Sequence, residues 1–328
     1  MKPSRIATVL DKLLETRWPA FIWGPPGVGK SSVVRMVAKR RALAIVDLRA
    51  SLLDPTDLRG IPAIENGRAV WCPPSFLPSG PQTKGLLFLD EINAAPPMVQ
   101  AALYQLVLDR RVGEYELPAG WRIVAAGNRA EDRAVVFRLS SALANRFVHL
   151  DFEVSYEDWR KWAVTADVHP LVVGFLALRR ELLLATNRNE TAFPTPRSWE
   201  MVSDVVKEFS SPADCKDLIP GIVGDGAAAE FLSFTKRALR EEDFIAILQK
   251  PATAKLPEGV GDIYALVTWI ARAAQDPDVQ SGSATLLGRL SPEFAVLLAK
   301  EMVAADPMFV SQPGYRDFLR SHGDLLAR

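Results

Sequence analysis

The sequence predicts an α/β fold, a mainly parallel sheet covered by helices, followed by a second half that is helical throughout. Four compact apolar runs, at 19–23, 42–48, 85–89 and 121–126, have the length and composition of strands buried in a sheet. Helical patterns separate these runs, and strands that alternate with helices usually pair in parallel. After Asp151 the strand signals stop and only helical patterns follow.

Helices are expected wherever apolar residues recur at a spacing of three and four. This spacing is present at 3–16, at 31–41 and at 98–109. The first of these segments precedes the first predicted strand, and the other two lie between strands. They can therefore cover the two faces of the sheet.

The second half is predicted to consist of helices joined by loops. We expect helices at 170–184 and 198–209 from their apolar spacing. A Gly/Ala-rich segment at 221–229 and a proline-bounded segment at 251–257 are predicted as loops between further helices. The sequence has no internal repeat and no low-complexity tract.

The charge balance limits the partners that the chain attracts. Its 328 residues include 39 Lys and Arg and 39 Asp and Glu, so the formal net charge is zero. Without net positive charge there is no general attraction to nucleic acid or to an anionic membrane. No run approaches the ~20 apolar residues of a membrane helix, and the N-terminus leads into a polar helix pattern. We expect a cytoplasmic protein without a membrane partner.

Cysteine and histidine are few and scattered. The two cysteines are Cys72 and Cys215, and the three histidines are His149, His169 and His322. None of these spacings resembles a zinc site. We expect two free thiols that are buried or half-buried.

The strongest motif lies directly after the first predicted strand. Residues 24–31 read Gly-Pro-Pro-Gly-Val-Gly-Lys-Ser and match the phosphate-binding pattern G-x-x-x-x-G-K-[ST], with a helix predicted next. Glycines let the backbone aim several N–H groups at one phosphate, and the helix N-terminus adds its positive dipole end. Lys30 is predicted to reach the β- and γ-phosphates and Ser31 to bind Mg²⁺. The predicted nucleotide-binding residues are Gly24, Pro25, Pro26, Gly27, Val28, Gly29, Lys30, Ser31 and Ser32.

Two acids end the apolar run 85–89. Asp90 is predicted to hold Mg²⁺, and Glu91 to act as the general base that polarises the attacking water. By itself, Asp-Glu after a strand is also a common helix N-cap, but the phosphate motif favours the catalytic interpretation. Asn93 follows and stays open between a structural and a functional role.

The strand predicted at 121–126 ends in Gly-Asn. Asn128 would lie beside the phosphate motif, where an amide can position the attacking water between Glu91 and the γ-phosphate. Gly-Asn is also a common turn dipeptide, which is the alternative. We favour the catalytic role because the neighbouring strand end is where such an amide is needed.

Several arginines are candidates for stabilising charge on the transferred phosphoryl group. Arg129, Arg133, Arg138 and Arg146 follow Asn128, and an arginine supplied in trans can have this role. Arg146 comes just after a short helical pattern, where it could reach a neighbouring subunit; a surface role is an equal alternative for Arg133 and Arg138. Arg197 begins a helix of the second half and could close over the phosphates, with helix capping as the alternative.

Taken together, these motifs resemble the AAA+ superfamily of ATPases, and the intervening segments are similar to its MoxR-like branch, which includes CbbQ, NorQ and RavA. The resemblance covers roughly residues 5–210. It identifies 24–31 with Walker A, 86–91 with Walker B and Asn128 with sensor 1. It also identifies Arg146 with the arginine finger and Arg197 with the sensor 2 arginine.

The resemblance also implies a domain division. It predicts an α/β nucleotide-binding domain at 1–150, a helical lid at 151–214 and a helical C-terminal extension at 215–328. Two segments look like the hairpin insertions of this branch, one near 58–71 with an Asn-Gly turn signal and one near 111–120. In the family such hairpins face the ring pore or a client; here an ordinary connecting hairpin is the alternative.

The implied function is that of a hexameric ring which hydrolyses ATP with Mg²⁺ and remodels or activates a protein client. A von Willebrand A-domain protein is the partner that the resemblance implies. Two other functions stay open. The first is a motor or loader acting on nucleic acid, against which the zero net charge argues. The second is an ATP-switched assembly factor with negligible turnover alone.

Overall fold

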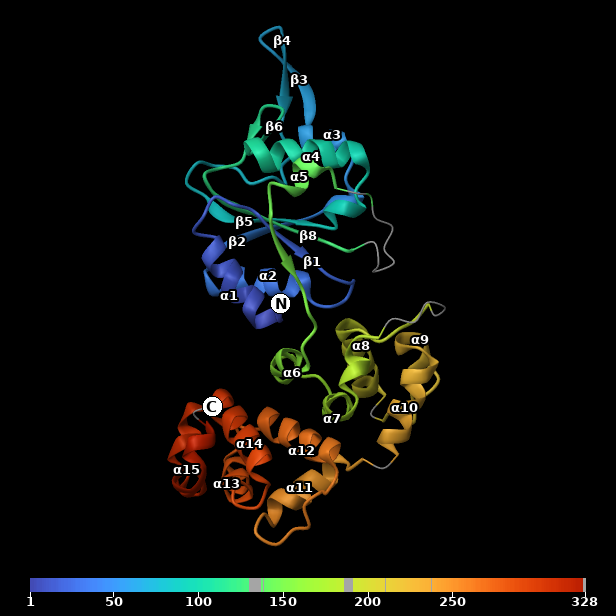
Figure 1. The fold of residues 1–328 in the computed structure, drawn as a ribbon, viewed down its shortest axis with the longest axis vertical. Helices are drawn as coiled ribbons and strands as arrows, with labels where there is room; N and C mark the ends of the chain where they lie inside the picture. Colours follow the sequence, from blue (N-terminus) through green and yellow to red (C-terminus); the bar gives the residue numbers. More distant parts are fainter. Residues whose placement is uncertain (130–136, 138, 186–190, 210, 237, 327–328) are drawn as a thin grey trace. The chain divides into compact units, whose positions relative to one another are not determined.

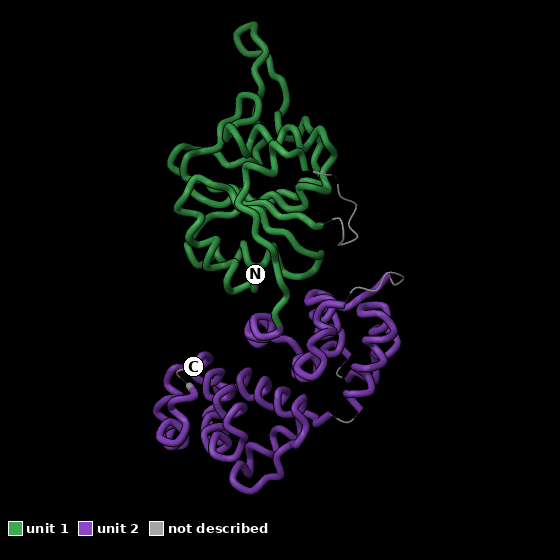
Figure 2. Tube along the Cα trace, viewed as in Figure 1, with its two compact units in different colours: residues 1–155 green, residues 156–328 purple. Residues whose placement is uncertain are grey.

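The chain forms two compact units, residues 1–155 and 156–328, which Figure 2 shows in different colours. The computed structural model describes residues 1–129, 137, 139–185, 191–209, 211–236 and 238–326. Each unit has its own apolar core and is described by itself.

A five-stranded parallel sheet forms the centre of the first unit (Figure 1). Its strands are β1 (Ala20–Trp23), β2 (Ala44–Arg49), β5 (Lys84–Asp90), β8 (Gly120–Gly127) and β9 (Val148–Asp151). The order across the sheet is β2-β5-β8-β1-β9, and every neighbouring pair is parallel. The predicted α/β fold with a parallel sheet is therefore confirmed.

Helices cover both faces of this sheet (Figure 1). They are α1 (Pro3–Leu13), α2 (Lys30–Arg40), α3 (Pro55–Arg59), α4 (Pro97–Asp109) and α5 (Ser141–Ala144), with short 3₁₀ turns η1 (Ala50–Leu52) and η2 (Ile92–Ala94). On the face covered by α4, Leu103 and Leu106 pack with Phe21, Leu87 and Leu89 of the sheet in one buried cluster. A sheet covered on both faces needs strands with continuous apolar segments, as β5 has at 85–89 and β8 at 123–127.

Two strands differ from the sequence prediction. The run 42–48 was expected to be a buried strand, but β2 is an edge strand, and only Leu48 among its residues is buried. The other edge strand, β9, was not predicted at all. It has only four residues, and two of them, His149 and Asp151, are exposed and polar. Such a short strand has too weak an apolar signal to be recognised.

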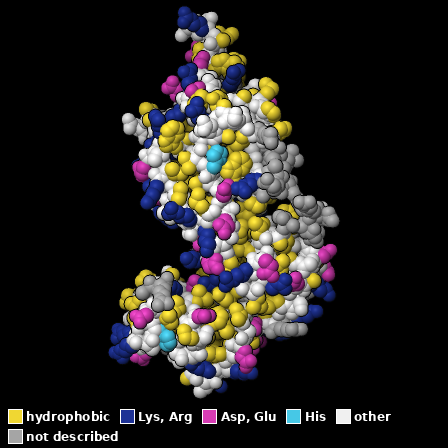
Figure 3. Space-filling model, in the orientation of Figure 1, with side chains coloured by type: hydrophobic (Ala, Val, Ile, Leu, Met, Phe, Trp, Pro, Cys, Tyr) yellow, Lys and Arg dark blue, Asp and Glu magenta, His cyan; other side chains and the backbone are white. Residues whose placement is uncertain are grey.

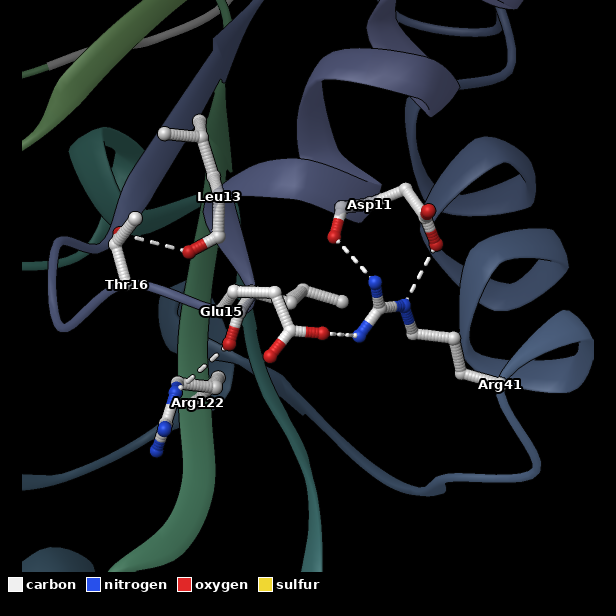
Figure 4. A network of polar contacts seen from close by, with 7 residues as sticks. Asp11, Leu13, Glu15, Thr16, Arg41 and Arg122 are labelled. Carbon is white, nitrogen blue, oxygen red and sulfur yellow. Dashed lines mark hydrogen bonds and ion pairs between the residues drawn. The ribbon is translucent and has the colours of Figure 1, made fainter.

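An arginine network fixes helix α1 to the rest of the first unit (Figure 4). The Arg41 guanidinium donates to the Asp11 carboxylate at 2.6 Å and to the Asp11 carbonyl at 2.7 Å, and it also pairs with Glu15. Nearby, Nε of Arg122 on β8 donates to the Leu14 carbonyl at 3.0 Å. The end of α1 is thus bound both to the segment after α2 and to the sheet.

Two hairpins lie at the predicted insertions. The first pairs β3 (Ile61–Glu65) with β4 (Arg68–Cys72) through Asn66 and Gly67, whose φ angles are 51° and 73°. Positive φ at both positions is the type I′ geometry that Asn-Gly favours. The second pairs β6 (Arg111–Val112) with β7 (Tyr115–Glu116).

The β3–β4 hairpin stands out from the rest of the first unit (Figure 1). Cys72 at its end is exposed, whereas Cys215 of the second unit is buried. The expectation of two shielded thiols is therefore wrong for Cys72, because the sequence does not show that this strand projects into solvent.

The second unit is helical throughout its described part. Its elements are α6 (Tyr156–Thr165), α7 (Pro170–Leu178), η4 (Arg180–Leu183), α8 (Pro196–Glu208), α9 (Pro220–Val223), α10 (Asp225–Thr235), α11 (Glu241–Gln249), α12 (Val260–Arg272), α13 (Pro277–Leu286), α14 (Pro292–Ala305), η5 (Pro307–Ser311) and α15 (Pro313–Leu326). Helices α7 and α12 approach so closely that a Cβ on Gly174 would lie 2.5 Å from the Gly261 carbonyl oxygen. Across the described chain, no helix combines the length and the apolar character needed to cross a membrane.

Two helix predictions need correction in this unit. The segment 221–229, expected to be a loop, is helical except at Gly224, whose φ of 83° separates α9 from α10. Its alanines favour helix, and one glycine is enough to break it. The helix expected at 170–184 ends at Leu178 and continues as the 3₁₀ turn η4.

Candidate active site

The phosphate motif connects the carboxyl end of β1 to the start of α2. Gly27 and Gly29 have φ angles of 77° and 102°, a left-handed conformation that glycine adopts without a steric penalty. Gly29 is the N-cap of α2, so the free N–H groups of its first turn lie next to the loop. The loop can therefore present backbone donors to an anion at a helix N-terminus.

Lys30 is held inside this loop. Its ammonium donates to the carbonyls of Gly24 at 2.5 Å and Pro25 at 2.8 Å, and to Oδ1 of Asn128 at 2.9 Å. The side chain is only 7% exposed, so the three oxygens compensate for much of its lost hydration. The predicted phosphate lysine and the predicted water-positioning amide are thus in direct contact.

Asn93 binds the backbone of Asn128 from the neighbouring strand end. Its Nδ2 donates to the Asn128 carbonyl at 2.6 Å, and its Oδ1 accepts from the Asn128 N–H at 3.2 Å. A Cβ on Gly127 would lie 2.3 Å from that Oδ1, so only glycine fits there. The sequence left the role of Asn93 open, and the structure shows that it positions Asn128.

Ser31 and Asp90 form an oxygen pair at the start of α2 and the end of β5. The Ser31 hydroxyl donates to Oδ2 of Asp90 at 2.8 Å. Hydroxyl and carboxylate oxygens are the ligands that Mg²⁺ prefers, and Mg²⁺ usually takes one or two of them along with phosphate oxygens and water. These two residues therefore fit the predicted metal site.

Glu91 has an unusual backbone and a hydrogen-bonded carboxylate. Its φ and ψ are 56° and 33°, and its N–H donates to Oδ1 of Asp90 at 2.9 Å. Left-handed geometry is unfavourable for a residue with a Cβ, by about 1–3 kcal/mol, and often marks a functional site. Oε2 of Glu91 accepts from the Ser51 hydroxyl at 2.5 Å.

Sequence reasoning missed Ser51. It lies in η1, just after β2, and so at the same carboxyl edge of the sheet as the motifs on β1, β5 and β8. The only available signal was a hydroxyl residue three positions beyond the predicted strand 42–48. Since ligands bind at this edge in parallel sheets, a polar residue that follows any of the strands can belong to the site.

The candidate arginines have different surroundings. Arg129 pairs with Asp151 of β9, and Arg133 and Arg138 lie outside the described residues. Arg146 follows α5 and is exposed, and within the described chain its guanidinium has neither an ion pair nor a hydrogen bond. An unpaired exposed arginine is available to a neighbouring molecule.

Arg197 belongs to the second unit. It is exposed in the first turn of α8. The N-cap of this helix is Thr195, whose hydroxyl accepts from the Ser198 N–H at 3.0 Å. Helix capping therefore does not account for Arg197.

Comparison with known proteins identifies the first unit. Residues 19–147 match the family model of the AAA domain, dynein-related subfamily, so this part of the chain is an AAA+ ATPase domain. A search of curated proteins gave no match.

Solved structures show distant similarities. The RuvB Holliday junction branch migration motor of Thermotoga maritima is 18% identical, with a TM-score of 0.40 over 75% of this chain and 74% of that one. NtrX from Brucella abortus in complex with ATP is 15% identical, with a TM-score of 0.41 over 98% of this chain and 67% of that one. Similarities this distant do not decide what the chain acts on.

Proposed function

We propose that this chain is a Mg²⁺-dependent ATP hydrolase that works as an oligomeric ring and uses turnover to remodel or activate a protein client. The observation that supports hydrolysis is the meeting of Lys30, Ser31, Asp90, Glu91 and Asn128 at the carboxyl ends of β1, β5 and β8, three adjacent strands. A phosphate-binding lysine, a metal pair, a carboxylate base and a positioning amide are the groups that phosphoryl transfer to water requires.

In this proposal each residue has a separate task. The P-loop backbone and Lys30 bind the β- and γ-phosphates, and Ser31 and Asp90 hold the Mg²⁺, which neutralises charge on the phosphate oxygens when bound. Glu91 accepts a proton from the attacking water, and Asn128 orients that water. The contact between Lys30 and Asn128 supports this division, because it places the orienting amide next to the phosphate-binding ammonium.

The ring is supported by Arg146. An exposed guanidinium that has no partner among the described residues can reach the γ-phosphate of a neighbouring subunit and stabilise the transition state there. Arg197 would close over the nucleotide from the helical unit. A hexamer, membership of the MoxR-like branch and a von Willebrand A-domain partner are proposed together, from the resemblance that the motifs carry.

The β3–β4 hairpin supports a protein client over nucleic acid. One of its faces consists of Pro62, Ile64, Ala69 and Trp71, which pair across the two strands, and Ile64 is 84% exposed. Figure 3 shows hydrophobic side chains on this hairpin, together with charged side chains near its tip. Exposed apolar side chains suit contact with a protein, whereas a phosphate backbone would require basic ones.

ATP turnover of the wild type and of Glu91→Gln tests the enzymatic part. We expect the variant to lose at least about 100-fold in turnover while it keeps its affinity for ATP. Equal rates would reject the proposed ATPase. Specific activity that rises with protein concentration supports the ring.

The client is tested with Glu91→Gln as a trap that holds ATP. A client is a protein that Glu91→Gln retains in the presence of ATP and that Lys30→Ala does not retain. The double variant Glu91→Gln/Ile64→Ser should no longer retain it. Met308→Ser, which changes an equally apolar and 68% exposed side chain of the other unit, should not affect retention. Retention that survives Ile64→Ser would exclude the hairpin as the contact, and salt-sensitive DNA binding by the wild type would favour nucleic acid instead.

A further inference from the structure

A hydrogen-bonded histidine joins the start of the phosphate loop to the helix that precedes Arg146. Trp23 is the last residue of β1, directly before Gly24, and its Nε1 donates to Nδ1 of His149 at 2.8 Å. Nε2 of the same imidazole lies 2.8 Å from the carbonyl of Ala144, the last residue of α5. Because Nδ1 accepts from Trp23, the ring hydrogen is on Nε2, and Nε2 donates to Ala144.

The sheet register places this imidazole where both contacts are possible. His149 lies beside Phe21 in the parallel pair of β1 and β9, so its side chain is on the same face as Phe21 and Trp23. Phe21 stacks on Trp23 with ring centroids 4.2 Å apart, and Phe147 meets Phe21 edge-on at 5.3 Å. These rings restrict the orientation of the indole and therefore that of its N–H group.

The strand β9 makes a second contact beside the nucleotide site. The Asp151 carboxylate pairs with Arg129, the residue after Asn128. Two exposed polar side chains of one edge strand, His149 and Asp151, thus bind the residues adjacent to the phosphate loop and to the positioning amide. The same strand begins two residues after Arg146. Because His149 is exposed, packing in the core does not explain a histidine at this position. Its hydrogen bonds to two separate elements do.

We infer that His149 is a positioning residue that couples the phosphate loop of one subunit to the arginine which that subunit presents to its neighbour. This inference rests on the proposed ring ATPase. Any shift of Trp23 with the phosphate loop passes through the imidazole to the Ala144 carbonyl, and so to the turn that carries Arg146. The two ring nitrogens of His149 bind Trp23 and Ala144, so His149 acts through these residues.

The variants separate the two hydrogen bonds. His149→Ala removes both, whereas Trp23→Phe removes only the indole donor and keeps the ring that stacks on Phe21. His322→Ala is the matched control, because it also removes a histidine, a half-buried one, but from α15 of the second unit. Each variant is measured for the dissociation constant of a fluorescent ATP analogue, for kcat at saturating ATP, and for thermal unfolding.

We expect His149→Ala to lower kcat about tenfold with a nucleotide affinity within about twofold of wild type, and Trp23→Phe to act in the same direction. In an Arg146→Ala background, His149→Ala should change kcat no further, because both act on one step. A full additional loss in that background, a fall in affinity that matches the fall in kcat, or wild-type kcat in both single variants would overturn the inference. If His149→Ala fails to fold, Trp23→Phe alone gives the same decision.

The Arg146→Ala single variant distinguishes failure of the proposed ring mechanism from failure of the coupling through His149. If it turns over ATP like the wild type, the trans-acting arginine is wrong, and the role of His149 is rejected with it. If Arg146→Ala is inactive but His149→Ala and Trp23→Phe are as active as wild type, only the coupling is wrong. The His322→Ala control should match the wild type in nucleotide affinity and in kcat.

Discussion

The side-chain amide of Asn93 binds both backbone groups of Asn128, donating to its carbonyl and accepting from its N–H. The side chain of Asn128 in turn accepts a hydrogen bond from the ammonium of Lys30. Asn93 is only 3% exposed, so its polar atoms have no solvent to replace these partners. The position of the Asn128 amide beside the phosphate loop therefore depends on Asn93, which follows the neighbouring strand β5.

Replacing Asn93 with alanine should impair catalysis more than binding. Both backbone groups of Asn128 would lose their buried partners, at a cost of about 1–3 kcal/mol for each group left unsatisfied. We expect kcat to fall about 10- to 100-fold, together with a lower unfolding temperature, while the affinity for ATP changes little.

Asn93→Asp is the informative comparison for that variant. It keeps an acceptor for the Asn128 N–H but has no donor for the Asn128 carbonyl when ionised. Steady-state ATPase assays and nucleotide titrations measure the two effects. An Asn93→Ala enzyme with wild-type kcat would show that the position of Asn128 does not matter for turnover.

Ser51→Ala tests the hydroxyl that binds the proposed base. The Ser51 hydroxyl holds one carboxylate oxygen of Glu91 at 2.5 Å, and without it the carboxylate can rotate away from the water. We expect kcat to fall about tenfold at unchanged ATP affinity. Ser51→Thr keeps the hydroxyl and should retain most of the activity. If alanine and threonine behave alike, the hydrogen bond has no part in the reaction.

The motifs could be predicted from the sequence because each is local. Gly24 to Ser31 combines a turn, a lysine and a helix start within eight residues, and Asp90 and Glu91 directly follow an apolar strand. The parallel sheet then brings separate strand ends to one edge. Local patterns and one topological rule are therefore enough to predict that Lys30, Asp90 and Asn128 lie near one another.

The contacts between motifs could not be predicted in this way. The Asn93–Asn128 pair and the Ser51–Glu91 hydrogen bond join residues 35 and 40 positions apart, and no periodicity connects them. Strand β9 escaped prediction because four residues with alternating polar side chains give no apolar run. The sequence also could not show that 221–229 continues as helix, since its glycines are read equally well as a loop.

Removing the metal or one of its ligands should reduce the stabilisation of the protein by ATP. A ligand that binds only the folded state at 100 times its dissociation constant stabilises a protein by about 2.7 kcal/mol. We expect ATP with Mg²⁺ to raise the unfolding temperature of the first unit, and the increase to shrink on chelation with EDTA or in Asp90→Asn. Without nucleotide, the wild type and Asp90→Asn should unfold at similar temperatures. If ATP with Mg²⁺ raises the unfolding temperature of the wild type and of Asp90→Asn equally, Asp90 does not bind the metal.

The second unit should become less stable in mild acid because of His169. Its Nδ1 accepts from the Leu171 N–H at 3.2 Å and so caps α7, which requires a neutral ring. Burial, together with the nearby charges of Arg272 and Lys207, lowers the pKa of His169 to about 4 from its ordinary 6.5. Between these two values the unfolded chain binds a proton that the folded chain does not. The stabilising contribution is therefore complete above pH 6.5 and is lost as the pH falls towards 4.

His169→Asn isolates this contribution from that of the carboxylates. Asparagine is a good N-cap but does not titrate, so the cap persists in acid. When the pH is lowered from 7.5 to 4.5, the free energy of unfolding of the wild type should fall by up to about 3 kcal/mol more than that of the variant. Urea unfolding followed by helical circular dichroism at a series of pH values measures this difference. Parallel pH curves for the two proteins would show that His169 titrates normally in the folded chain.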